Sequence, residues 1–138
     1  MSTFVDTNVL VYAHDADAGR KQTIAAALLR ELWESRDGIL STQVLQEFYV
    51  NITRKIPKPV PRKDARDLIH TYAAWRVVVV EVDDVLLASD FEDRYRLSFW
   101  DALIVASALR ANADVVASED LQAGQKIRGI HIQNPFKA

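Results

Sequence analysis

Four acidic residues stand at positions from which they could share one metal site. Asp6 follows the short β-prone stretch 3–5, and Asp120 comes just after a second such stretch, 114–117. Glu47 and Asp101 fall in the first turns of two segments with helical spacing. In open parallel α/β sheets, ligands bind beyond the carboxyl ends of the strands. We therefore expect the four acids to reach one crevice.

Carboxylates in one crevice repel one another and need protons or a cation. Two charges about 4 Å apart repel by roughly 4 kcal/mol at an effective dielectric near 20. Oxygen ligands suit Mg²⁺ or Mn²⁺, whereas zinc more often recruits His or Cys. The chain has no cysteine, and His14, His70 and His131 show no paired ligand spacing. The pattern favours a hard divalent cation.

Each acid also has a structural interpretation. Asp6 and Asp101 could cap helices, Glu47 could form a salt bridge, and Asp120 could start a turn. Apolar neighbours surround Glu47 and Asp101. Since an ionised acid beside apolar residues is costly without a partner, these neighbours favour a functional site.

Strand-like and helix-like segments alternate along the chain. We expect strands at 3–5, 39–40, 77–82, 114–117 and 129–132, and helices from about 7, over 20–34, 42–54, 62–75 and 83–94, and from 98. Pro57, Pro59 and Pro61 separate two helices. The apolar stretch 77–82 is expected to be buried on both faces. This alternation predicts a three-layer α/β/α sandwich with a mainly parallel sheet of four to five strands.

Composition limits the class of protein. The 138 residues form no low-complexity linker, so we expect a single domain over 1–138. The lack of cysteine excludes thiol catalysis and disulfides and suits a reducing compartment. Without a signal peptide or an apolar run long enough to cross a bilayer, we expect a cytoplasmic protein that uses no membrane.

Basic residues gather in one segment although the chain has a net charge of -2. We expect Lys55, Lys58, Arg62 and Lys63 to contact phosphates beside the crevice, although the same residues could form only a solvated surface. For Trp33, Trp75 and Trp100, we favour core packing over base stacking.

Four motifs resemble the PIN domain family in their order and wording: FVDTNVLVY, STQVLQEF, SFWDALIVASA and SEDLQAGQ. The resemblance spans nearly the whole chain and implies that Asp6, Glu47, Asp101 and Asp120 are the catalytic acids and the ligands of Mg²⁺ or Mn²⁺. It also implies supporting roles for polar residues, namely Thr7, Asn8, Ser41 and Ser118. Glu119 is a further acid whose role the motifs do not separate from that of Asp120.

The resemblance implies a ribonuclease of the kind found as the toxin of a toxin–antitoxin pair. We expect hydrolysis of RNA phosphodiesters to a 5′-phosphate and a 3′-hydroxyl by a metal-activated water. A homodimer and a small antitoxin partner are implied in the same way. Leu10, Tyr12 and Leu28 could form a partner surface or belong to the core.

Other functions remain open at this point. A PIN-like module that has lost catalysis would bind RNA or a partner, but such domains usually lack part of the acidic set. A haloacid-dehalogenase-like phosphatase would need a second Asp two residues after Asp6, where this chain has Asn8. A receiver-like module would need adjacent acids before its first helix, and these are missing.

Overall fold

The sheet has six strands in the part of the chain that the structure, a computed structural model, describes, which is residues 1–137. The strands are β1 (Thr3–Val5), β2 (Gly38–Ser41), β3 (Arg76–Val78), β4 (Val115–Ala117), β5 (Lys126–Ile127) and β6 (Ile130–Gln133). Their order is β3-β2-β1-β4-β6-β5, and only the β5–β6 pair is antiparallel. The mainly parallel α/β sandwich is therefore confirmed, with one strand more than expected.

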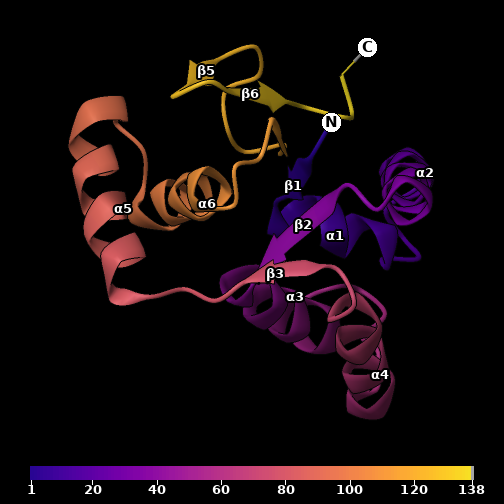
Figure 1. Cartoon of the computed structure of the whole chain (residues 1–138). Helices are drawn as coiled ribbons and strands as arrows, with labels where there is room; N and C mark the ends of the chain where they lie inside the picture. Colours follow the sequence, from indigo (N-terminus) through magenta and orange to yellow (C-terminus); the bar gives the residue numbers. More distant parts are fainter. Residues whose placement is uncertain (138) are drawn as a thin grey trace.

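Helices cover both faces of this sheet (Figure 1). They are α1 (Thr7–Ala13), α2 (Arg20–Ser35), α3 (Thr42–Arg54), α4 (Arg62–Tyr72), α5 (Val82–Tyr95) and α6 (Phe99–Arg110). The chain steps from β1 to β2 to β3 in one direction and then returns to β4 on the other side of β1. Right-handed crossovers therefore place α1 to α4 on one face and α5 and α6 on the other.

The reversal of strand order makes β1 and β4 neighbours at the centre of the sheet. Phe4 of β1 pairs with Val116 of β4 on one side and with Ile39 of β2 on the other. Side chains from both layers, including Phe48 and Phe91, are fully buried around these strands. The carboxyl ends of β1 and β4 therefore lie side by side, as a switch-point site requires.

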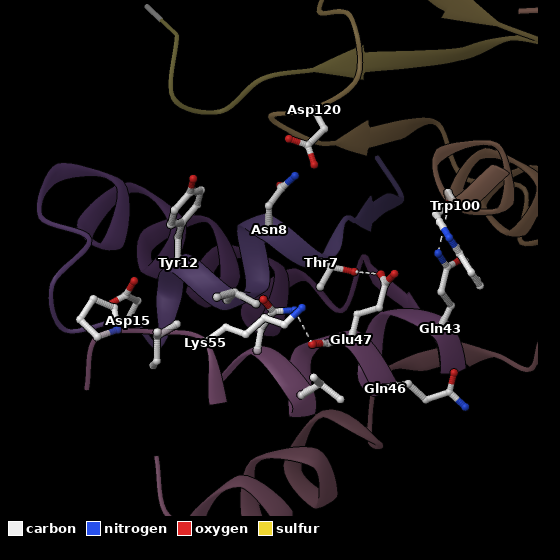
Figure 2. Close-up of a pocket in the computed structure, with 15 residues that line it drawn as sticks. Thr7, Asn8, Tyr12, Asp15, Gln43, Gln46, Glu47, Lys55, Trp100 and Asp120 are labelled. Atoms are coloured by element: carbon white, nitrogen blue, oxygen red, sulfur yellow. Dashed lines mark hydrogen bonds between the residues drawn. The ribbon is translucent and has the colours of Figure 1, made fainter. Parts of the chain in front are cut away.

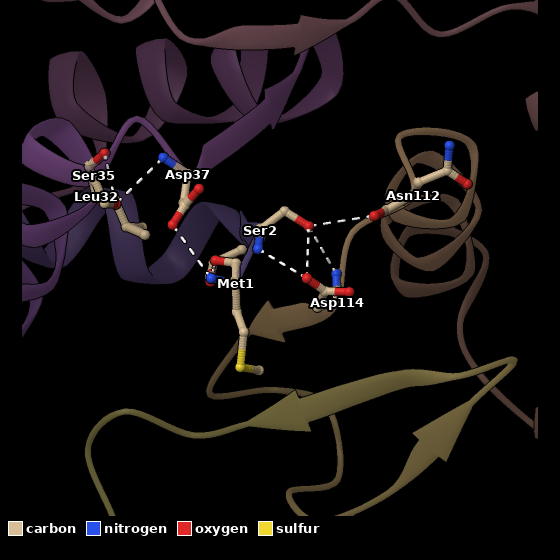
Figure 3. Close-up of polar contacts among 8 residues, drawn as sticks. Met1, Ser2, Leu32, Ser35, Asp37, Asn112 and Asp114 are labelled. Atoms are coloured by element: carbon tan, nitrogen blue, oxygen red, sulfur yellow. Dashed lines mark hydrogen bonds and ion pairs between the residues drawn. The ribbon is translucent and has the colours of Figure 1, made fainter.

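Polar contacts fix the opposite end of the same two strands (Figure 3). The Ser2 backbone N–H donates to Asp114 Oδ2 at 3.0 Å, and the Ser2 hydroxyl donates to the carbonyl oxygen of Asn112 at 3.3 Å. Hydrogen bonds to a charged acceptor are stronger than neutral ones. The two hydrogen bonds of Ser2 hold the start of β1 against the loop that leads into β4.

The apolar stretch 77–82 is not the buried strand that its sequence predicts. Strand β3 ends at Val78, and Val79 and Val82 are 59% and 74% exposed. The reason is that β3 is the edge strand of the sheet, with β2 as its neighbour in residues 1–137. A capping box between Glu81 and Asp84 then starts α5.

Arg110 holds the segment between β3 and α5 in this position. Its guanidinium donates to both carboxylate oxygens of the buried Asp84 at 2.8 Å and also to the carbonyl of Val79. This contact joins the end of α6 to the start of α5. Periodicity of apolar residues could not reveal it, because it depends on two residues distant in sequence.

The tryptophans differ in their environments. Trp75 is buried as expected, and Trp33 packs against the rings of Trp75 and Tyr72 while remaining 38% exposed. For Trp100 the expectation of core packing is wrong, since this residue is 60% exposed.

The sequence does not predict strand β5, because two residues are too few to show an alternation of buried and exposed positions. Among the helices of residues 1–137, none is long and apolar enough to cross a membrane.

Candidate metal centre and cleft

Three of the four expected acids lie together at the ends of the central strands. Asp6 follows β1, Asp120 follows β4, and Asp101 lies in the first turn of α6. One carboxylate oxygen from each lies within 4.8 Å of the other two. We call Asp6, Asp101 and Asp120 the three-carboxylate group.

Asp6 is the buried member of the group, with 4% of its surface exposed. The Thr7 backbone N–H donates to Asp6 Oδ1 and the Ser118 hydroxyl donates to Asp6 Oδ2, both at 2.7 Å. Burial raises the pKa of Asp6 to about 7, although these two hydrogen bonds oppose the shift; the charges of Asp101 and Asp120 add to it. The anionic form of Asp6 therefore needs a compensating positive charge.

Asp101 is also shifted toward its neutral form. Burial raises the pKa of Asp101 above its ordinary value, and the charges of Asp120 and Glu47 raise it further, against a hydrogen bond from Ser98. Within residues 1–137, no Lys, Arg or His forms an ion pair with the three-carboxylate group or with Glu47. Converging carboxylates without a cationic side chain are a donor set that fits a hard divalent cation.

Glu47 lies in the cleft but outside the three-carboxylate group. The Thr7 hydroxyl donates to Glu47 Oε1 at 2.6 Å, which holds α3 against the start of α1 (Figure 2). Glu47 is near enough to act on the pKa of Asp101. The structure thus places Glu47 beside the centre, with Thr7 as its orienting residue.

The adjacent acids Glu119 and Asp120 have different surroundings. The Tyr12 hydroxyl donates to Glu119 Oε1 at 2.7 Å, and the Lys21 ammonium pairs with Glu119 Oε2. Burial alone would raise the pKa of Glu119, but hydrogen bonds from Lys21 and Tyr12 lower it below its ordinary value. Both oxygens of Glu119 therefore bind side chains of α1 and α2. Asp120 is the acid that belongs to the three-carboxylate group.

The remaining polar residues of the motifs hold the loop that carries Asp120. The Ser118 hydroxyl accepts from the Asp120 backbone N–H at 3.1 Å, and Asn8 Oδ1 accepts from the Glu119 N–H at 3.3 Å. Asn8 Nδ2 is buried without a hydrogen-bond partner in the described part of the chain. Ser41 instead caps α3, where its hydroxyl accepts from the Val44 N–H.

A cleft of about 700 Å³ runs beside this centre. Its lining includes Asp120, Glu47 and two residues that the sequence analysis did not place in a site, Gln43 and Trp100. Gln43 Nε2 donates to the carbonyl oxygen of Trp100 at 3.2 Å, so α3 and α6 are joined at one end of the cleft (Figure 2). The sequence feature that could have predicted Gln43 in the site is its position four residues before Glu47, because residues four apart lie on one face of a helix.

The four basic residues that we expect to contact phosphates lie in different surroundings. Lys55, at the end of α3, lines the cleft. Lys58 Nζ lies 3.7 Å from Asp17 Oδ1, and Lys63 Nζ lies 3.5 Å from Asp67 Oδ2. Arg62 is exposed at the start of α4. Of these four residues, Lys55 is the one that shares a cleft with Glu47 and Asp120.

The fold is shared with solved toxin structures. VapC20 of Mycobacterium tuberculosis, described as a sarcin–ricin loop cleaving toxin, aligns with a TM-score of 0.66 and 22% identity over 86% of this chain and 90% of its own. A toxin–antitoxin complex from Klebsiella pneumoniae aligns with a TM-score of 0.70 and 19% identity over 99% and 100%. VapBC2 of Rickettsia felis, bound to a promoter DNA fragment, aligns with a TM-score of 0.67 and 16% identity over 97% of this chain and 98% of its own.

Sequence comparison identifies the family. Comparison with curated proteins gives no match. The profile of the PIN domain, by contrast, matches residues 3–126. That range includes the three-carboxylate group, Glu47 and the polar residues around them. The chain therefore belongs to the PIN domain family.

Proposed function

We propose that this protein is a metal-dependent ribonuclease that acts as the toxin of a toxin–antitoxin pair. The observation that carries the proposal is the three-carboxylate group without a cationic side chain, at the switch point of a PIN fold. The likeness to VapC20, whose description names cleavage of the sarcin–ricin loop, supports RNA as the substrate. The alternative of a silent RNA-binding module is less well supported, because the acidic set is complete.

The chain's own residues would hold and orient the reacting groups. Asp6, Asp101 and Asp120 would bind Mg²⁺ or Mn²⁺, while Ser118 and the Thr7 N–H fix both oxygens of Asp6. When bound, the cation supplies a water of lowered pKa and neutralises charge that develops on the phosphate. Glu47 keeps Oε2 without a protein donor in residues 1–137, and this oxygen can accept a proton from the attacking water.

The reaction is an in-line hydrolysis. The oxygen of water forms a bond to phosphorus as the bond from phosphorus to the 3′-oxygen breaks, and the leaving 3′-oxygen takes up a proton from solvent water. The products are a 5′-phosphate and a 3′-hydroxyl. No nucleophilic side chain takes part, in keeping with the cysteine-free sequence; in residues 1–137, the serine of the site, Ser118, bonds to Asp6 and to backbone N–H groups and not to a histidine.

The proposed partners follow from the structural neighbours. The Klebsiella pneumoniae and Rickettsia felis structures are toxin–antitoxin assemblies. We infer that a small antitoxin binds this chain and lays its C-terminal segment across the acidic cleft, and that the chain forms a homodimer.

The test is cleavage of total RNA by the purified protein with Mg²⁺ or with EDTA. We expect cleavage with Mg²⁺ and its loss in EDTA and in Asp6→Asn. Asp93→Asn, which changes an exposed acid on α5, is the matched control and keeps activity. Full cleavage by Asp6→Asn would contradict the mechanism, and RNA binding without cleavage by the wild type would favour the silent module. Growth arrest on expression of the wild type, but not of Asp6→Asn, tests the toxin role.

A further inference from the structure

Trp100 lines the cleft and is largely exposed instead of buried in the core. The side chain is 60% exposed and lines the same cleft as Glu47 and Asp120. Its one aromatic neighbour in residues 1–137 is Phe99, in an edge contact at 5.2 Å. Large exposed aromatic side chains are costly in water, and the fold offers no covering for this one.

The position of Trp100 is fixed relative to the proposed metal centre. Trp100 directly precedes Asp101 in α6, so their Cα atoms are about 3.8 Å apart. The Ser98 hydroxyl accepts from the Asp101 N–H, which caps this turn of the helix. Gln43 of α3, itself buried, donates to the Trp100 carbonyl oxygen. An exposed aromatic residue whose backbone is held in place therefore lies one residue from a ligand of the proposed cation.

We propose that Trp100 is the stacking platform for an unpaired nucleobase next to the scissile phosphate. The inference rests on the proposed ribonuclease function and adds a residue that would position the RNA beside the acids. Aromatic side chains stack on any base, because every base has a flat π-face. RNA bases are available for such stacking in loops, bulges and single strands and not within a duplex.

The walls around Trp100 favour a nucleotide over an apolar protein segment. The cleft beside it combines polar side chains, among them Gln46, Asn51 and Lys55, with apolar ones such as Val50. A nucleotide has both kinds of surface, because its base presents a flat π-face and its phosphate is charged. A wholly apolar segment would leave the polar side chains of the cleft without partners. A second hollow, between α3 and α4, is lined by Leu45, Tyr49, Val50 and Ile69 and suits such a segment better.

Binding and turnover of a short single-stranded RNA test the proposal in Trp100→Ala and Trp100→Phe. Binding is measured with Mg²⁺ in the Asp6→Asn background, so that the RNA stays intact. Loss of one stacked base should weaken binding about 5- to 150-fold in Trp100→Ala. In the otherwise wild-type enzyme, Trp100→Ala should raise KM by a similar factor with little change in kcat. Trp100→Phe should retain most of the affinity, and Trp33→Ala, which changes a tryptophan outside the cleft, should bind like the parent.

An abasic RNA series shows whether the partner of Trp100 is a base. After the cleavage position has been mapped, single abasic nucleotides are placed on either side of it. One of them should weaken binding to the parent as much as Trp100→Ala does and add little in that variant, as expected for two groups in contact. Equal RNA affinity with and without the indole would overturn the proposal and leave a protein segment as its occupant. A wild type that cleaves no RNA would instead contradict the proposed function.

Discussion

A single buried carboxylate dominates the electrostatics of the centre. Asp6 accepts two hydrogen bonds, yet burial outweighs them and raises its pKa to about 7. Charges from Asp101 and Asp120 act in the same direction. Ionised Asp6 therefore lowers the stability of the protein when no metal is bound, which is typical of a centre that binds a cation.

The first prediction concerns the stability of the metal-free protein. Between about pH 4 and about pH 7, folded Asp6 holds a proton that the unfolded chain has released. The free energy of unfolding should therefore fall as pH rises through this range. A pKa raised from 3.8 to about 7 corresponds to at most about 4 kcal/mol. Asp6→Asn does not titrate at this position. As pH rises from about 4 to about 7, its free energy of unfolding should therefore rise relative to that of the wild type by up to about 4 kcal/mol.

Denaturant titrations of both proteins in EDTA at several pH values give the difference. Added Mg²⁺ should reduce it, because the cation compensates the charge of Asp6. A pH-independent difference in EDTA would show that the burial of Asp6 has no electrostatic cost.

The second prediction separates the adjacent acids Asp120 and Glu119. A cation that binds only the folded state raises the melting temperature. Asp120→Asn should lose most of the Mg²⁺-induced increase, whereas Glu119→Gln should keep it despite a lower starting stability, since Glu119 binds Tyr12 and Lys21 instead. Glu47→Gln should fall between them. Calorimetry with and without Mg²⁺ measures the shifts, and an equal loss in the two adjacent variants would assign Glu119 to the site.

At the scale of elements, the sequence predicts those parts that depend on local pattern. Asp6, Asp101 and Asp120 could be expected together because strand ends and helix starts are readable from apolar spacing and caps. The edge strand at Val77 and Val78 could not, since exposure depends on which strands flank it. The same holds for Trp100, whose apolar sequence neighbours suggest a core position, and for the pairing of Glu119 with Lys21.

The third prediction concerns the packing of β2. An added Cβ at Gly38 would lie 2.3 Å from Cζ3 of the Trp75 ring, which is closer than any real contact. Gly38→Ala should therefore force the ring to move and lower the free energy of unfolding by about 1–3 kcal/mol. Trp75→Leu should cost less in the Gly38→Ala background than in the wild type. Additive costs in chemical denaturation would show that the ring and Gly38 do not compete for space.

At the scale of the whole molecule, attraction of a polyanion has to be local. The chain carries 17 basic and 19 acidic residues, and several of the acids line the cleft. Ion pairs also occupy basic residues: Lys21 pairs with Glu119 and Arg110 with Asp84. Lys55 lies inside the cleft, on the α3 wall that also carries Glu47 (Figure 2). It has no ion pair in residues 1–137.

The last prediction is that Lys55 contributes more to RNA binding than its exposed neighbour Lys63. A lysine that neutralises one phosphate of a single strand releases counterions, so losing it should reduce the slope of log affinity against log salt by roughly 0.7. We expect this change in Lys55→Ala. In Lys63→Ala it should be smaller, because Lys63 is directed to Asp67 along α4 and away from the cleft residues. Removing Lys58 and Arg62 as well should flatten the slope further if the whole segment follows the RNA backbone.

Turnover at saturating RNA should change little in either lysine variant, because phosphate contacts position the substrate and the carboxylates act on the reacting phosphate. Binding titrations at several salt concentrations, in the Asp6→Asn background, measure the slopes. Equal slopes for Lys55→Ala and Lys63→Ala would mean that the segment acts through diffuse positive potential and not through a seated phosphate. A fall in kcat with Lys55→Ala would instead place its ammonium at the reacting phosphate, which is compatible with its position on the same cleft wall as Glu47.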